Sequence, residues 1–125
     1  MGKDLKTRSF RKSLGEANRG ILYSLRTQKH LRFHIFSASI VLFMAWWCHL
    51  SRPEVVLLIL TIGSVIAAEI FNTAIEVVVD LAEPTFHPLA GLAKDVAAGA
   101  VLVTAIQSVV IGILIFGPVL MEGIK

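Results

Sequence analysis

Three long apolar runs constrain this chain more than any other feature. They cover about residues 33–50, 55–79 and 96–120, and together they take up more than half of the 125 residues. The two later runs are long enough for an α-helix to cross a bilayer with some tilt. Apolar residues make up 55% of the chain, which is high for an ordinary soluble domain. We therefore expect an all-α integral membrane protein, with three transmembrane helices in a single membrane domain over residues 1–125.

The charge of the chain is concentrated near its N-terminus, where most of the twelve Lys and Arg residues lie within residues 1–32. Over about residues 9–29, apolar residues recur every three or four positions and basic residues occupy another side. This pattern predicts an amphipathic helix lying on the membrane surface. Anionic lipid headgroups account for the basic charge, so we expect no nucleic-acid partner. The positive-inside rule places the N-terminus in the cytoplasm and the protein in the cytoplasmic (inner) membrane.

Three spans from a cytoplasmic N-terminus fix the expected sidedness. The short turn at residues 51–54 is then outside, and the polar loop at residues 80–95 is inside, on the same face as the surface helix. We expect Gly117 and Pro118 to end the third span, because proline interrupts helical hydrogen bonding. His30 and His34 lie four residues apart and are expected at the level of the lipid headgroups.

Polar side chains interrupt the second run. Glu69, Asn72, Glu76 and Asp80 are spaced by three, four and four residues, so they line one side of a helix. At about 1.5 Å per residue, Glu69 lies a little past the midplane and Glu76 at the cytoplasmic headgroups. Ionisable groups in a span face a bundle interior or a polar cavity. They serve either as hydrogen bonds between helices or as chemical groups.

The polar side chains from Glu69 to Asp80 form a polar track along the expected helix. If they take part in chemistry, the groups at the two ends of this track have different tasks. A buried carboxylate such as Glu69 can act as a general base. Glu76, near the interface, can hold Mg²⁺, which keeps most of its waters and bridges to phosphate. Lys94 and Asp95 add a cation and an acid at the start of the third span, although Lys94 also fits an ordinary topology anchor.

Other functions stay open at this point. The chain lacks a P-loop, a dinucleotide-binding glycine motif and the H-E-x-x-H zinc motif. A small proton-coupled transporter subunit would use Glu69 as its proton-binding acid, and a purely structural scaffold would not need Glu69 at all.

The motif E-x-x-N-T-A-I-E-x-x-x-D at residues 69–80, followed by A-K-D at residues 93–95, resembles the prokaryotic diacylglycerol kinase family, which includes the undecaprenol kinases. The resemblance covers nearly the whole chain. It implies a homotrimeric membrane enzyme with sites between subunits, which transfers the γ-phosphate of MgATP to a lipid hydroxyl. The acceptor would be undecaprenol, giving undecaprenyl phosphate, or alternatively diacylglycerol, giving phosphatidate; the stretches T-Q-K-H-L-R-F-H and H-P-L-A look closer to the undecaprenol branch.

The resemblance also implies roles for individual residues. Glu69 matches the catalytic base that meets the lipid, Glu76 matches a metal ligand, and Ala98 falls where the third span borders the lipid. Gln28 stands where many members carry a Glu as second metal ligand, so it implies either a site role or a capping or packing role. The residues matched to ATP binding are Lys12, Glu16, Gln28, Asn72, Glu76, Asp80, Thr85, Phe86, His87, Lys94 and Asp95.

Overall fold

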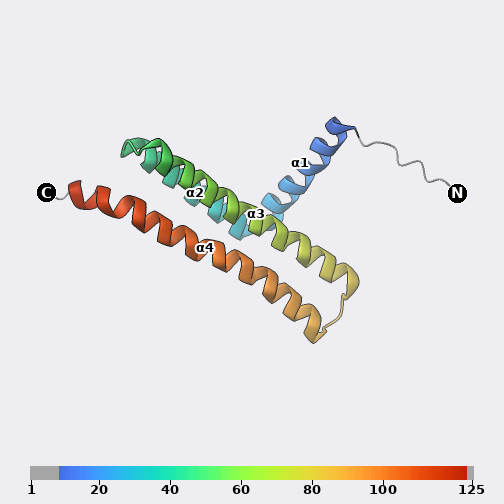
Figure 1. The fold of residues 1–125 in the computed structure, drawn as a ribbon. Helices are drawn as coiled ribbons and strands as arrows, with labels where there is room; N and C mark the ends of the chain where they lie inside the picture. The colour runs from blue at the N-terminus through green and yellow to red at the C-terminus, as the bar shows by residue number, and fades with distance from the viewer. Residues whose placement is uncertain (1–8, 124–125) are drawn as a thin grey trace.

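The structure, a computed structural model, describes residues 9–123 and is entirely α-helical over that range. Its four helices are α1 (Phe10–Thr27), α2 (Lys29–Trp47), α3 (Arg52–Ala82) and α4 (Pro88–Gly123). Helices α2, α3 and α4 run antiparallel to their neighbours in a long bundle, and α1 projects from it at an angle (Figure 1). The prediction of an all-α protein is confirmed for the described residues.

A one-residue break separates α1 from α2. Gln28 has an extended backbone with φ −110° and ψ 105°, and it serves both as the C-cap of α1 and as the N-cap of α2. The Arg32 guanidinium donates hydrogen bonds to the carbonyl oxygens of Leu25 and Arg26 at 2.7 and 3.0 Å. These bonds satisfy carbonyls that the end of α1 leaves open. As a result α2 begins at Lys29, four residues before the apolar run.

The turn between α2 and α3 is built from two standard capping motifs. His49 has φ 51°, and the amide hydrogen bonds from His49 to Trp46 and from Leu50 to Ala45 form a Schellman motif. The first turn of α3 is closed by the Glu54 carboxylate, which accepts hydrogen bonds from the Ser51 amide and hydroxyl at 2.8 and 2.7 Å. This local chemistry reverses the chain within four residues.

The cytoplasmic loop expected at residues 80–95 is much shorter than predicted. Helix α3 continues to Ala82 and α4 begins at Pro88, which leaves residues 83–87 between them. Leucine and alanine on both sides of the loop are strong helix formers, and Pro88 occupies the first helical position, where proline costs nothing. Asp80 therefore lies inside α3, and Lys94 and Asp95 lie in the second turn of α4.

Gly117 and Pro118, which were expected to end the third span, do not end the helix that carries them. Helix α4 continues through both residues to Gly123. Proline removes one backbone hydrogen bond, and the loss is tolerated where the freed carbonyl finds another partner. Pro118 is exposed on the surface of the chain, so its ring displaces no packed neighbour.

The three long helices pack most closely at the end of the bundle that holds the α2–α3 turn. The buried residues Ala45, Leu58, Ile115 and Phe116 form one cluster there. Toward the other end, buried positions on α3 are increasingly polar. The buried residues of this helix recur every three or four positions and are Leu58, Thr61, Val65, Glu69 and Thr73.

Two helices, α3 and α4, are long and apolar enough to cross a membrane. Only 22% and 11% of their most apolar stretches is buried within the chain, unlike the core helix of a soluble protein. Helix α2 has 19 residues, including Lys29 and Arg32, and it does not meet the same criterion of length and composition. The large exposed apolar surface needs lipid or further protein to cover it.

Candidate active site

The deepest ionisable group in the described chain is Glu69, at the middle of the bundle. The residue is 4% exposed. One of its carboxylate oxygens, Oε1, lies 3.2 Å from Nε2 of His34 on α2. The hydroxyl of Thr73, one turn later, donates to the Glu69 carbonyl oxygen rather than to its carboxylate. His34 is thus the polar side chain that meets this carboxylate within the described residues.

A second polar cluster lies two turns further along α3 and joins it to the α1–α2 break. The Glu76 carboxylate accepts a hydrogen bond from Nδ2 of Asn72 at 3.2 Å and one from Nε2 of Gln28 at 3.5 Å. Gln28 is itself the extended residue between the two helices, and its side chain points toward α3, where it contacts Glu76. The backbone of Gln28 caps both helices, as the capping role left open by the sequence requires.

The side-chain oxygen of Asn72 is buried and has no hydrogen-bond partner within the described chain. Its orientation is set by the Glu76 carboxylate, which needs the amide nitrogen as a donor. A buried acceptor without a donor costs about 1–3 kcal/mol. This oxygen is therefore available to a hydroxyl or amine of a bound molecule.

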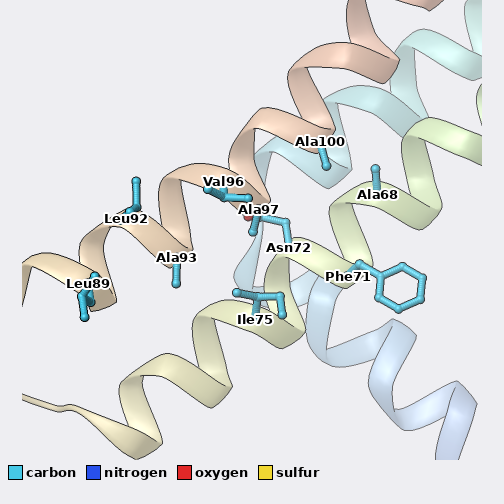
Figure 2. Close-up of a pocket in the computed structure, with 10 residues that line it drawn as sticks. All are labelled: Ala68, Phe71, Asn72, Ile75, Leu89, Leu92, Ala93, Val96, Ala97 and Ala100. Carbon is cyan, nitrogen blue, oxygen red and sulfur yellow. The ribbon is translucent and has the colours of Figure 1, made fainter.

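An apolar groove of about 670 Å³ runs between α3 and α4 beside this cluster. Figure 2 shows its lining side chains coming from the two helices, with Asn72 reaching toward α4 and the Phe71 ring pointing away from it. Ala68, next to Glu69 in sequence, also lines the groove. The groove has the size and apolar character of a site for a hydrocarbon chain. Its lining residues are Ala68, Phe71, Asn72, Ile75, Leu89, Leu92, Ala93, Val96, Ala97 and Ala100.

A polar cavity of about 230 Å³ lies at the α3–α4 loop. Nζ of Lys94 lies 2.5 Å from Oδ1 of Asp80 and links the two helices at this cavity. The Lys94 side chain is 40% exposed, so an anion can reach it. Five residues that the sequence matched to ATP binding line this one cavity, namely Asp80, Thr85, Phe86, His87 and Lys94.

The loop residues in this cavity also have local structural contacts. The Thr85 hydroxyl donates to the Glu83 carboxylate. Nδ1 of His87 accepts a hydrogen bond from the Leu89 amide at 3.1 Å and so satisfies one open donor at the start of α4. The Phe86 side chain is 93% exposed.

Four of the predicted site residues lie apart from these clusters within the chain. Lys12 and Glu16 lie in the first half of α1, whereas its groove against α3 is lined by the later residues Gly20, Tyr23 and Ser24. Asp95 and Ala98 are exposed on α4 and do not line the apolar groove.

The sequence analysis missed the position of His34, which it placed with His30 at the headgroups. The structure places His34 against Glu69, with its side chain 22% exposed. A periodic signal was present, because the inward-facing residues of α2 recur at spacings of three and four. They are Leu31, His34, Ala38, Val41 and Ala45.

The candidate metal ligands are few. Residues 9–123 contain no group of three or more His, Cys, Asp or Glu side chains that could hold a metal ion. Glu76 on α3 and Gln28 at the α1–α2 break do converge, and they offer one carboxylate and, once Gln28 turns its amide, one amide oxygen. Mg²⁺ is commonly held by one or two carboxylates, waters and substrate phosphates. This donor set therefore fits Mg²⁺ delivered with a nucleotide.

Comparison with known proteins gives a consistent picture. The family model for prokaryotic diacylglycerol kinase matches residues 15–116. The chain is 46% identical over 109 residues to an undecaprenol kinase of Bacillus subtilis, covering 87% of this chain and 89% of that protein. It is 44% identical over 94 residues to a diacylglycerol kinase of Synechocystis, covering 74% of this chain and 54% of that protein. A diacylglycerol kinase of Escherichia coli is 40% identical over 67 residues, covering 54% of this chain and 55% of that protein.

Proposed function

This chain belongs to the prokaryotic diacylglycerol kinase family and is a membrane lipid kinase with ATP as phosphate donor, and we propose that its acceptor is undecaprenol. Alignment with an undecaprenol kinase over most of both chains supports this acceptor. Diacylglycerol is the alternative, because the other relatives named above are diacylglycerol kinases. The family match favours a kinase over the transporter subunit that the sequence alone left open.

The observation that carries the mechanism is the order of polar groups along α3. Glu69 lies buried at mid-bundle, Glu76 two turns later, and Asp80 at the loop with Lys94. A lipid hydroxyl comes from the bilayer and a nucleotide from the aqueous side, so this order follows the path between the two substrates. Phosphoryl transfer depends mainly on positioning and on neutralising charge, and a polar track at the boundary provides both.

Glu69 is proposed as the general base at the lipid end. It would take the proton of the acceptor hydroxyl while the hydroxyl oxygen attacks the γ-phosphorus and ADP leaves with the electron pair of the broken bond. The apolar groove beside Ala68 and Asn72 would hold the hydrocarbon chain of the acceptor. The unpartnered oxygen of Asn72 would accept a hydrogen bond from the bound substrates. Ala98, which is exposed on α4 outside this groove, is proposed to border lipid.

At the aqueous end, we propose that Glu76 and Gln28 hold Mg²⁺, which supplies charge neutralisation on the phosphates. Lys94, half-buried beside Asp80, would bind the phosphates of ATP. The loop cavity would hold the rest of the nucleotide. The remaining residues proposed to contact ATP are Lys12, Glu16, Asn72, Asp80, Thr85, Phe86, His87 and Asp95.

We also propose a homotrimer in the cytoplasmic (inner) membrane, with α2 as a third span and the N-terminus in the cytoplasm. Helix α2 packs beside α3, exposes Phe33, Phe36 and Phe43, and ends in Trp46 and Trp47, which suits an interfacial aromatic belt. The exposed apolar surface supports subunit contacts. Assembly would also give Lys12 and Glu16 a route to the nucleotide of a neighbouring subunit.

The test is transfer of labelled γ-phosphate from MgATP to undecaprenol or diacylglycerol, offered separately in detergent micelles. Label on undecaprenol alone supports the proposed acceptor, and label on diacylglycerol alone replaces it. Glu69→Gln should lower transfer at least about 100-fold, the low end of general-base contributions. Glu54→Gln, the same change at the far end of α3, should leave the rate nearly unchanged. An active Glu69→Gln enzyme would remove the base assignment.

A further inference from the structure

The partner of the buried carboxylate is a titratable side chain that no sequence motif identifies. His34 Nε2 lies 3.2 Å from Glu69 Oε1, and the two side chains are 22% and 5% exposed. A carboxylate buried without a partner tends to take up a proton and then cannot act as a base. An imidazole at this distance can stabilise the carboxylate form and hold it in one orientation.

His34 also lines a small cavity between α2, α3 and α4. The cavity has a volume of about 100 Å³ and carries the hydroxyls of Ser37 on α2 and Ser108 on α4. Each of these hydroxyls donates to a backbone carbonyl of its own helix, so each keeps acceptor capacity for another group. A cavity of this kind needs only about 10–15 Å³ to hold a water molecule, together with two to four polar partners. The cavity therefore has room for water next to the imidazole.

Other charged groups are kept away from this pair. On α2, His30 is exposed one turn earlier and Arg32 is bound to carbonyls at the end of α1. On α3, the next carboxylate is Glu76, which is engaged by Gln28 and Asn72. Helix α4 carries no titratable side chain between Asp95 and Glu122, and Tyr23 of α1 is 52% exposed in another groove.

We propose that His34 is a positioning residue for Glu69, whose imidazole holds the carboxylate ionised and in one orientation during phosphoryl transfer. This inference rests on the proposed function of Glu69. The neutral imidazole donates its Nε2 hydrogen to Oε1 of the carboxylate, so the proton that Glu69 takes from the acceptor hydroxyl leaves the carboxyl group for water in the adjoining cavity. The carboxylate is thereby restored for the next turnover, and the net reaction releases one proton with ADP.

The pair has a definite expected pH dependence. The active form has a neutral imidazole and an ionised carboxylate. As the pH falls, the pair gains one proton, and either location of that proton weakens the base. Without an imidazole, only the carboxylate can take up a proton. The loss of kcat on the acid side should therefore begin at a lower pH when His34 is replaced by a side chain that does not titrate.

The kinetic test compares pH profiles of kcat in His34→Gln, His34→Leu and wild type. Glutamine can still donate a hydrogen bond to the carboxylate but cannot take up a proton. We expect His34→Gln to shift the acid limb to lower pH, and His34→Leu to lower kcat about 10–100-fold with the KM for ATP unchanged. His30→Gln, one turn earlier and exposed, should match wild type. Profiles of both His34 variants identical to wild type would overturn the proposal.

A second measurement does not depend on activity. NMR spectra of the histidine side chains at one pH, assigned by the single variants, report on the surroundings of each imidazole. Glu69→Gln removes the carboxylate that lies 3.2 Å from Nε2, so the signals of His34 should move while those of His30 stay in place. Unmoved His34 signals overturn the pairing. If wild type transfers no phosphate but the His34 signals move, the proposed function fails and the pairing of His34 with Glu69 stands.

Discussion

The contact between Gln28 and Glu76 predicts how a single substitution changes the dependence on Mg²⁺. Gln28 Nε2 lies 3.5 Å from Glu76 Oε2, so Gln28→Glu would bring two carboxylates to about the same separation. At an effective dielectric constant of about 20, two like charges at that distance repel by about 5 kcal/mol, an upper value because the site is partly open to water. Without a divalent cation, the variant should therefore be less stable than wild type.

When Mg²⁺ is bound, the added carboxylate of Gln28→Glu becomes favourable. A divalent ion about 4 Å from one added negative charge gains about 2 kcal/mol even in a water-like dielectric. Each 1.4 kcal/mol is a factor of ten in affinity. The free Mg²⁺ concentration for half-maximal activity should thus fall at least about tenfold in Gln28→Glu.

The assay is phosphate transfer at fixed ATP over a range of free Mg²⁺, together with thermal unfolding in detergent with EDTA or with Mg²⁺. Gln28→Ala is the matched control, because it loses the hydrogen bond to Glu76 without adding charge. It should weaken activation by Mg²⁺ and should not gain stability when Mg²⁺ is added. If Gln28→Glu has the Mg²⁺ dependence of wild type, these two residues do not form the metal site.

Two further predictions follow from named contacts. Lys94→Met should raise the KM for ATP at least about tenfold, because a charge-assisted hydrogen bond to phosphate is worth about 1.5–3 kcal/mol. Steady-state kinetics measures this KM, and an unchanged value would leave Lys94 as a topology anchor. His49→Gly should stabilise the fold by about 1 kcal/mol, because His49 has φ 51° and glycine adopts this conformation without strain. Unfolding midpoints in detergent measure this gain, His49→Ala should not show it, and equal midpoints for the glycine variant and wild type would argue against strain at the turn.

Much of the secondary structure could be predicted from local sequence alone. The apolar runs predicted helices, and those in α3 and α4 lie within the observed boundaries. The errors occurred where local chemistry was misjudged. Pro84 and Pro88 made residues 80–95 look like a long loop, yet the leucine and alanine residues around them extend both helices, and Pro88 begins one of them.

For the candidate site too, one part could be predicted from the sequence and another part could not. The spacing of Glu69, Asn72, Glu76 and Asp80 placed them along one helix because helical periodicity is a property of the chain itself. The same spacing did not show that Glu69 faces α2 while Asn72 lines the groove against α4. That distinction depends on where neighbouring helices pack, which no local pattern specifies.

The sequence by itself determined that this protein is helical, that it is too apolar for water, and that carboxylates lie in its second long apolar run. These properties follow from composition and from the 3.6-residue period of the helix. Only the tertiary structure decided which side chains meet: His34 with Glu69, Gln28 with Glu76, and Lys94 with Asp80. Each pair joins residues that are distant in sequence or lie on different helices, and the packing and turns of the whole chain fix their relative position.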